Sequence, residues 1–169
     1  NQFFLEAVWN ENGGRDKYFH LDTCKEFDPY RYVGTKTKGC IITDKDAAVM
    51  KDILDGPRRA NGEQMWYGFR PGVQNWQCVI PIGTYYYPLF GHRIKPFALG
   101  PIYIRWITNH PKDNFKQMTR QQYETLYDTG LEKFSDNLGD NPAIDAFVER
   151  GGKLMIDHGI DDPLIPVDG

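Results

Sequence analysis

Serine is almost absent from this sequence. Its 169 residues include one serine, Ser135, in the stretch EKFSDNLG at the end of a predicted helix. No G-x-S-x-G elbow, the sharp turn that exposes a nucleophilic hydroxyl group, occurs in the chain. Ser135 is therefore expected to be structural, and the residues themselves supply no serine nucleophile.

Cysteine and histidine are also scarce. The three cysteines, Cys24, Cys40 and Cys78, form no C-x-x-C pair, and the four histidines are scattered along the chain. A zinc site needs several such ligands at short, regular spacing, and a cysteine nucleophile needs a positioned histidine. Neither is indicated, and the odd cysteine count leaves one disulfide or three free thiols equally open.

Long apolar runs and clustered positive charge are missing too. No stretch approaches the ~20 apolar residues of a membrane span, and the net charge is -3, with lysines and arginines scattered. We expect neither a membrane nor nucleic acid as a partner, because phosphate backbones require a basic surface. The beginning, NQFFLEAVWNE, has neither an initiator Met nor the features of a signal peptide, so a mature or processed segment is expected.

Aromatic residues, by contrast, are abundant, at 14% of the chain. The length suits one domain, and the other composition is ordinary for a soluble globular protein. Between residues 57 and 101, aromatics are interspersed with glycines and prolines, which exclude a long helix, yet the segment is too apolar for disorder. We expect an ordered, loop-rich aromatic wall that is either core or the lining of a pocket for a flat ligand.

Local signals predict helices on both sides of this wall. Apolar residues at helical spacing predict one helix over residues 3–9 and another from Thr43, its cap, to Gly56. Residues 103–107, YIRWI, begin either a helix or a strand. Thr119 and Gln122 form a capping-box pattern that opens a long helix.

The end of the chain has the pattern of a helix, a strand and a loop. Asn141 is expected to cap a short helix whose apolar residues face inward, namely Ile144, Phe147 and Val148. The run at 153–157 is expected to form a buried strand, and turn residues follow it. The sequence therefore predicts a helix-strand-loop unit that belongs to a larger α/β sheet.

Two adjacent carboxylates, Asp161 and Asp162, follow the predicted strand. α/β folds place catalytic and binding groups just past the carboxyl ends of strands. Aspartate before proline is also common in reverse turns, which its side chain stabilises through the backbone. The pattern of residues alone favours the turn.

Three stretches together resemble the tannase and feruloyl esterase family. GGKLMIDHGIDDPLIPVDG, residues 151–169, is similar to the family's G-G-K-L-hydrophobic-x-x-H-G-x-x-D-P-x-I-P stretch. FDPYRYVGTKTKGCIITDKDAAVMKDILDGPRRANGEQMWYGFRPG, residues 27–72, is similar to its lid segment, and IYIRWITNHPKDNF, residues 102–115, to the segment that returns from the lid to the sheet. The matches are collinear and span nearly all of the chain.

This resemblance implies an α/β-hydrolase with a lid domain inserted before the strand that bears the catalytic acid. Residues 1–140 would form the lid, with mixed helices and loop-rich aromatic segments. Residues 141–169 would be a helix, strand and acid loop of an incomplete hydrolase core. The acid falls on Asp162, which would orient a histidine ring while a serine attacks an ester carbonyl group. The resemblance therefore favours a catalytic role for Asp162, whereas Asp161 is still expected to be a turn residue.

The family's serine elbow and catalytic histidine match no residues of this chain. The chain alone is therefore not expected to hydrolyse esters, and hydrolase segments that carry these two residues are its expected partners. The resemblance further implies a secreted enzyme whose substrate is a small ester of gallic, ferulic or a similar aromatic acid.

In relatives the lid also supplies residues that sandwich the aromatic ring. The candidates here are Trp66, Tyr67, Phe69, Phe90, Phe97 and the run Tyr85–Tyr87, with Arg93 for a polar substituent of the acyl group.

The family's lids usually hold calcium in an aspartate-rich loop. Here Asn12, Asp16 and Asp22 offer oxygen ligands, but the spacing of the loop is broken. We therefore expect weak or absent calcium binding and no other cofactor. Cys24 and Cys40 each match one member of two family disulfides whose partners are absent, so a Cys24–Cys40 bridge is the pairing that the resemblance suggests.

Two other functions remain open. The aromatic wall would also suit a non-catalytic domain that binds plant phenolics or sugars. A terephthalate-monoester hydrolase of the same family would differ only in the pocket for the acyl group.

Overall fold

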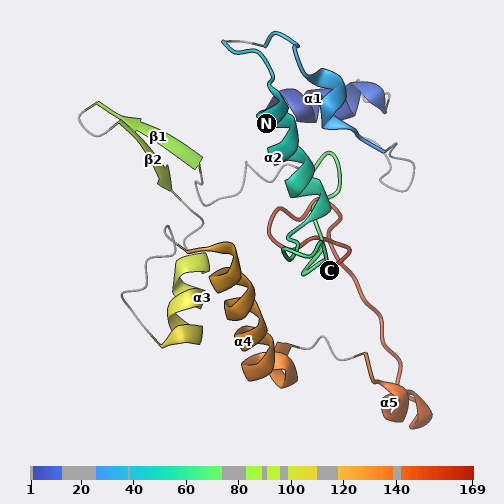
Figure 1. Cartoon of the computed structure of the whole chain (residues 1–169). Coiled ribbons are helices and arrows are strands. Elements are labelled where there is room, and N and C mark those ends of the chain that lie inside the picture. The colour runs from blue at the N-terminus through green and yellow to red at the C-terminus, as the bar shows by residue number, and fades with distance from the viewer. Residues whose placement is uncertain are drawn as a thin grey trace. The chain divides into compact units, whose positions relative to one another are not determined.

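The computed structural model describes residues 2–12, 26–37, 39–73, 83–88, 91–95, 99–109, 118–138 and 142–169. Contacts within the chain divide it into two compact units, whose elements are labelled in Figure 1. Unit 1 comprises Asn1–Val79 together with His158–Gly169, and unit 2 comprises Ile80–Asp157. The division between lid and hydrolase core at residue 140 concerns the complete protein and remains a prediction.

The two helices predicted for unit 1 are present as α1 (Gln2–Glu11) and α2 (Asp44–Asp55). Thr43 caps α2 through a reciprocal capping box: the Asp46 amide donates to Thr43 Oγ1 at 3.3 Å, and the Thr43 amide donates to Asp46 Oδ2 at 2.8 Å. Gly56 ends the helix with a φ of 77°, a backbone conformation that favours glycine. A short 3₁₀ helix, η2 (Pro29–Tyr32), lies between α1 and α2 in the sequence.

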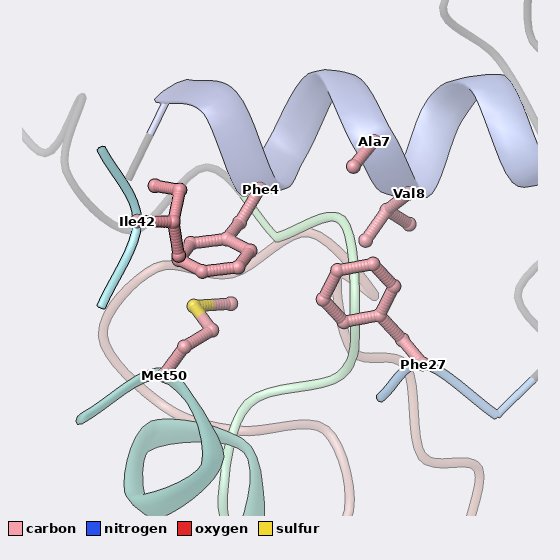
Figure 2. Packing of buried hydrophobic residues seen from close by; sticks show 6 residues of the cluster. All are labelled: Phe4, Ala7, Val8, Phe27, Ile42 and Met50. Carbon is pink, nitrogen blue, oxygen red and sulfur yellow. The ribbon is translucent and has the colours of Figure 1, made fainter. Parts of the chain in front are cut away.

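The core of unit 1 forms where the apolar face of α1 meets α2 and the segments before it. Figure 2 shows the cluster, which consists of Phe4, Ala7, Val8, Phe27, Ile42 and Met50. Each large side chain buried in this way contributes about 1.5–3 kcal/mol to folding. Tyr32 stacks on Phe27, with 5.7 Å between the ring centroids, and its hydroxyl group donates to the Glu11 carboxylate. Burial, followed by this hydrogen bond, raises the pKa of Tyr32 to about 12.

Unit 2 contains an antiparallel hairpin that the sequence signals did not predict. It pairs β1 (Gly83–Tyr87) with β2 (Gly91–Lys95), and the register sets Tyr85 opposite Arg93. The segment was expected to be irregular, so two short strands are the correction.

Two packed helices follow the hairpin in the sequence, α3 (Leu99–Thr108) and α4 (Arg120–Leu138). α3 settles the ambiguity over YIRWI in favour of a helix. The capping box of α4 is confirmed, since the Thr119 amide donates to Gln122 Oε1 at 2.8 Å and the Gln122 amide to Thr119 Oγ1 at 3.2 Å. Ile107 is buried between the helices, and a Cβ atom on Gly130 would lie 2.7 Å from the Tyr103 hydroxyl oxygen.

The end of unit 2 differs from the prediction in two ways. The short helix α5 (Asp145–Glu149) begins after Ile144, which makes no side-chain capping bond, and the predicted cap Asn141 lies outside the described residues. Its apolar residues do not face inward: Ile144, Phe147 and Val148 are all exposed. The prediction of an inward face was wrong because no described element packs against that face.

The strand predicted at 153–157 does not form in this structure. Residues 152–159 are neither helical nor paired, and the side chains of Met155 and Ile156 are 91% and 81% exposed. A strand exists only by pairing with neighbours. No described segment of this chain provides a neighbour for it.

Candidate functional site

Trp66 and Tyr67, two of the predicted ring-binding residues, lie on a loop that folds back on the end of α2. The backbones of the two segments approach so closely that a Cβ atom on Gly56 would lie 2.5 Å from the Trp66 carbonyl oxygen. A Cβ atom on Gly68 would lie 2.1 Å from the Leu54 carbonyl oxygen. Glycine at both positions is therefore required to hold the aromatic pair where it is.

The two rings form an exposed, roughly perpendicular pair. Their centroids are 5.7 Å apart and their planes meet at 82°. The side chain of Trp66 is 38% exposed and that of Tyr67 is 47% exposed. Such a pair offers flat apolar surface for a ligand ring, together with two polar groups that can form hydrogen bonds.

Asp162 stands in a turn of the chain, and its carboxylate organises that turn. Oδ1 accepts hydrogen bonds from the Leu164 amide at 2.7 Å and from the Ile165 amide at 3.2 Å. These two backbone bonds, followed by the charge of His158, hold the pKa of Asp162 below its usual range. The carboxylate is thus ionised at neutral pH, as the acid of a catalytic triad must be.

The second oxygen of Asp162 has a different environment. Among the described residues it accepts no hydrogen bond, and the His158 Nε2 atom is 3.9 Å away. Nε2 lies 3.0 Å from the carbonyl oxygen of Ile165, which can only accept, so this nitrogen carries the proton. His158 therefore closes the loop from 158 to 165, and Oδ2 of Asp162 retains capacity to accept a bond from another donor.

The Trp66–Tyr67 loop and the loop that contains Asp162 both belong to unit 1, and an ion pair joins them directly. Arg70, which follows the aromatic pair, binds Asp168, which follows Asp162, through two hydrogen bonds of 2.8 Å and 2.5 Å. The chain therefore brings Trp66, Tyr67 and the Asp162 loop into one structural unit. No spacing in the sequence indicates this pairing, because the two partners are 98 residues apart.

Comparisons with known proteins find esterases that are similar to this chain. The chain is 29% identical over 163 residues to a probable feruloyl esterase of Arthroderma benhamiae, which covers 89% of this chain. It is 28% identical over 134 residues to a tannase of Aspergillus oryzae, which covers 74% of it. The resemblance to the tannase and feruloyl esterase family is confirmed. No protein-family model matches the chain.

The crystal structure of feruloyl esterase B from Aspergillus oryzae has a similar fold. The TM-score is 0.67 at 16% identity, and the match covers 97% of this chain. At that identity the likeness concerns the fold alone. The chain spans 28% and 22% of the two curated relatives and 32% of the solved esterase.

A ring-binding role for the other candidates from the tannase and feruloyl esterase pattern stays a prediction. Arg93 lies in β2 of unit 2, opposite Tyr85. Phe90 and Phe97 lie outside the described residues. A surface depression along α3 and α4 includes none of the predicted ring-binding residues; it is lined by Ile107, Thr119, Gln121, Gln122, Thr125, Leu126, Thr129 and Lys133.

Two further predictions concern a disulfide and the ligands of a calcium ion. Cys40 is an exposed free thiol in this structure, and Cys24 lies outside the described residues, so the suggested Cys24–Cys40 bridge stays a prediction. The Asn12 side-chain amide donates to the Val8 carbonyl oxygen at 2.9 Å, whereas Asp16 and Asp22 lie outside the described residues. Within the described ranges no cluster of His, Cys, Asp or Glu could hold a metal ion. Nor does any described helix have the length and apolar character to cross a membrane.

Proposed function

We propose that this chain supplies the lid and the catalytic acid of a serine ester hydrolase that cleaves aromatic carboxylic esters. The observation that carries the proposal is the geometry of Asp162. One carboxylate oxygen is held by two backbone amides, and the other retains capacity for a further donor. This carboxylate lies in the loop that resembles the acid loop of tannases and feruloyl esterases.

In this mechanism Asp162 accepts a hydrogen bond from the ring of a histidine and stabilises the imidazolium that forms. The histidine removes the proton from a serine hydroxyl group, and the serine oxygen attacks the ester carbonyl carbon. The alcohol leaves with that proton, and water then cleaves the acyl-enzyme to release the acid. The serine and the histidine come from hydrolase segments other than these 169 residues.

Trp66 and Tyr67 would bind the aromatic ring of the acyl group. Their exposed, perpendicular faces suit a planar acid such as ferulic or gallic acid. Secretion of the protein belongs to the same proposal, since the resemblance implies it.

The exposed run at the end of unit 2 supports a place beside a hydrolase core. Leu154, Met155 and Ile156 follow two glycines and are largely exposed in this chain. Strands buried on both faces of an α/β sheet have such continuous apolar runs. We propose that this run becomes a strand of the sheet in the complete enzyme.

Turnover of defined esters tests the proposal. The protein is expressed from the complete reading frame that contains this chain and is assayed with methyl ferulate, methyl gallate, a terephthalate monoester and an aliphatic methyl ester. We expect hydrolysis of at least one aromatic ester, with kcat/KM for the aliphatic ester roughly 100-fold lower, since the apolar ring contributes about 3 kcal/mol of binding. Binding of free ferulic or gallic acid without turnover of any ester would instead support the non-catalytic domain.

The ring-binding role has its own matched pair of variants. Trp66→Ala should raise KM for the aromatic ester roughly tenfold, because it removes flat apolar contact area. Trp106, which is 78% exposed on α3, provides the control variant Trp106→Ala. Equal effects of the two substitutions would remove Trp66 from the pocket.

A further inference from the structure

Two segments of unit 1 carry the candidate groups, and an ion pair between side chains joins them. Arg70 Nε donates to Asp168 Oδ2 at 2.8 Å, and Arg70 Nη2 donates to Asp168 Oδ1 at 2.5 Å. A two-point contact between guanidinium and carboxylate sets orientation as well as distance. The hydrogen bonds and charge of Arg70 hold the pKa of Asp168 below its usual range, so the pair is charged at neutral pH.

The residues beside this ion pair are also in close contact. Gly169 packs on the indole ring of Trp66, where a Cβ atom on the glycine would lie 2.9 Å from Nε1. The Gly169 amide donates to the carbonyl oxygen of Pro166 at 3.0 Å, and Pro166 is buried. The end of the loop is thus folded on itself and against the aromatic segment.

The carboxylate of Asp162 depends on this arrangement for its position. Among the described residues, its hydrogen bonds lie within its own loop, to the amides of Leu164 and Ile165. These bonds set its orientation within the loop but not the position of the loop on the rest of unit 1. Catalysis is sensitive to such placement, because a shift of about 1 Å can cost roughly 100-fold in rate.

We propose that Arg70, acting through Asp168, is a positioning residue that holds the Asp162 loop against the Trp66–Tyr67 segment. Its consequence for catalysis rests on the function proposed above, whereas the structural coupling does not. Arg70 acts through Asp168 and contacts no reacting atom, so its removal leaves the chemistry of Asp162 unchanged and loosens the placement of that group.

Hydrogen exchange tests the coupling in the protein expressed from the complete reading frame. In Arg70→Gln, the amides of Leu164 and Ile165 should exchange about fivefold faster, the size expected for a partly exposed ion pair that limits opening of the loop. Lys51→Gln is the matched control, because Lys51 pairs with Asp55 inside α2. Amides of Ala47 and Met50 in α2 report whether the variant remains folded. Unchanged exchange at Leu164 and Ile165 would overturn the proposal.

A double-mutant cycle shows whether Arg70 and Asp168 act through their contact with each other. Asp168→Asn should speed exchange as much as Arg70→Gln, and the double variant should be no faster than either single variant. Effects that multiply would show that the two residues act independently, and the proposal would then be wrong.

The pH profile of kcat/KM tests the catalytic consequence. A misplaced carboxylate raises the pKa of the catalytic histidine less, so Arg70→Gln should move the acidic limb of the profile about half a pH unit lower. General loss of structure would lower kcat/KM at every pH without moving the acidic limb. Faster exchange of the Leu164 and Ile165 amides with an unmoved acidic limb would overturn the positioning role. If the unaltered protein hydrolyses no ester, the proposed function fails, while the exchange result still decides the coupling.

Discussion

The two units of this chain differ in how many apolar side chains they bury. Where burial is described, unit 1 encloses most of the buried apolar side chains around α1 and α2, whereas in unit 2 the buried ones are Ile107 and Leu126. Both units expose large apolar side chains, but unit 2 has fewer buried ones to set against them; its exposed residues are Ile102, Tyr103, Trp106, Tyr123, Ile144, Phe147, Val148, Leu154, Met155 and Ile156. Exposed apolar surface of this extent is typical of a surface that another part of a protein covers.

This difference indicates what each unit contributes. Unit 1 has its own core, and the same unit holds the aromatic pair and the Asp162 loop. In unit 2, α4 begins with a capping box, and α3, α4 and α5 each expose large apolar side chains. We infer that unit 1 can keep its candidate groups in place with its own contacts, whereas unit 2 depends more on the hydrolase segments proposed above.

The largest expected effect is on the core of unit 1. Phe4 is 2% exposed at the centre of the cluster in Figure 2, so Phe4→Ala should lower the free energy of unfolding by about 3–5 kcal/mol through lost burial and a cavity. Chemical denaturation followed by circular dichroism measures this loss. Measured on these 169 residues alone, Ile156→Ala in unit 2 is the control, because Ile156 is exposed there, and it should change stability by less than ~0.5 kcal/mol. A similar loss in both variants would contradict the comparison of the two units.

Removing a helix cap should lower stability less than the core substitution does, and the loss should be similar in the two units. Thr43→Ala removes the cap of α2 and Thr119→Ala that of α4, and each should cost about 1 kcal/mol in the stability of its helix. Site-resolved hydrogen exchange of α2 and α4 amides measures each loss separately. If the cap of α4 contributed nothing, the helices of unit 2 would be held by tertiary contacts, contrary to this account.

The smallest expected effect is on thermal stability at low pH. The pKa of Asp168 is lowered from its ordinary value of 3.8, so its ion pair with Arg70 stabilises the folded state above that pH and is lost as the pH falls below it. Both side chains are about a third exposed, and the contribution is therefore below ~1 kcal/mol. Calorimetry at pH 7 and pH 3 should show a smaller drop in Tm for Asp168→Asn than for the unaltered protein. An equal drop would mean that the ion pair contributes no stability.

Features with local signals were predicted correctly from the sequence. Thr43 and Gly56 bound α2 as expected, and Thr119 with Gln122 opens α4, because caps and helix stops depend on neighbouring residues. The turn at Asp162 is of the same kind, since Asp162 bonds to amides two and three residues further on. The resemblance supplied the catalytic role for that residue, which the turn pattern alone would not have suggested.

Features that depend on distant partners were missed or misjudged. The pairing of β1 with β2 was overlooked because the aromatic run before Gly91 lacks a typical hairpin turn signal. The inward face of α5 and the strand at 153–157 required a surface to pack against, and no described segment provides one. The Arg70–Asp168 pair is likewise invisible to spacing rules, since it forms only after the chain has folded.

The turnover of Asp162→Asn tests the central claim most directly. In the protein expressed from the complete reading frame, kcat for an aromatic methyl ester should fall roughly 10³- to 10⁴-fold, with KM changed less than about twofold, because the neutral amide cannot stabilise the imidazolium. Asp161→Asn, one residue away and exposed, is the matched control and should retain kcat within about threefold. Near-normal turnover of Asp162→Asn would contradict the account and leave Asp162 as a turn residue alone.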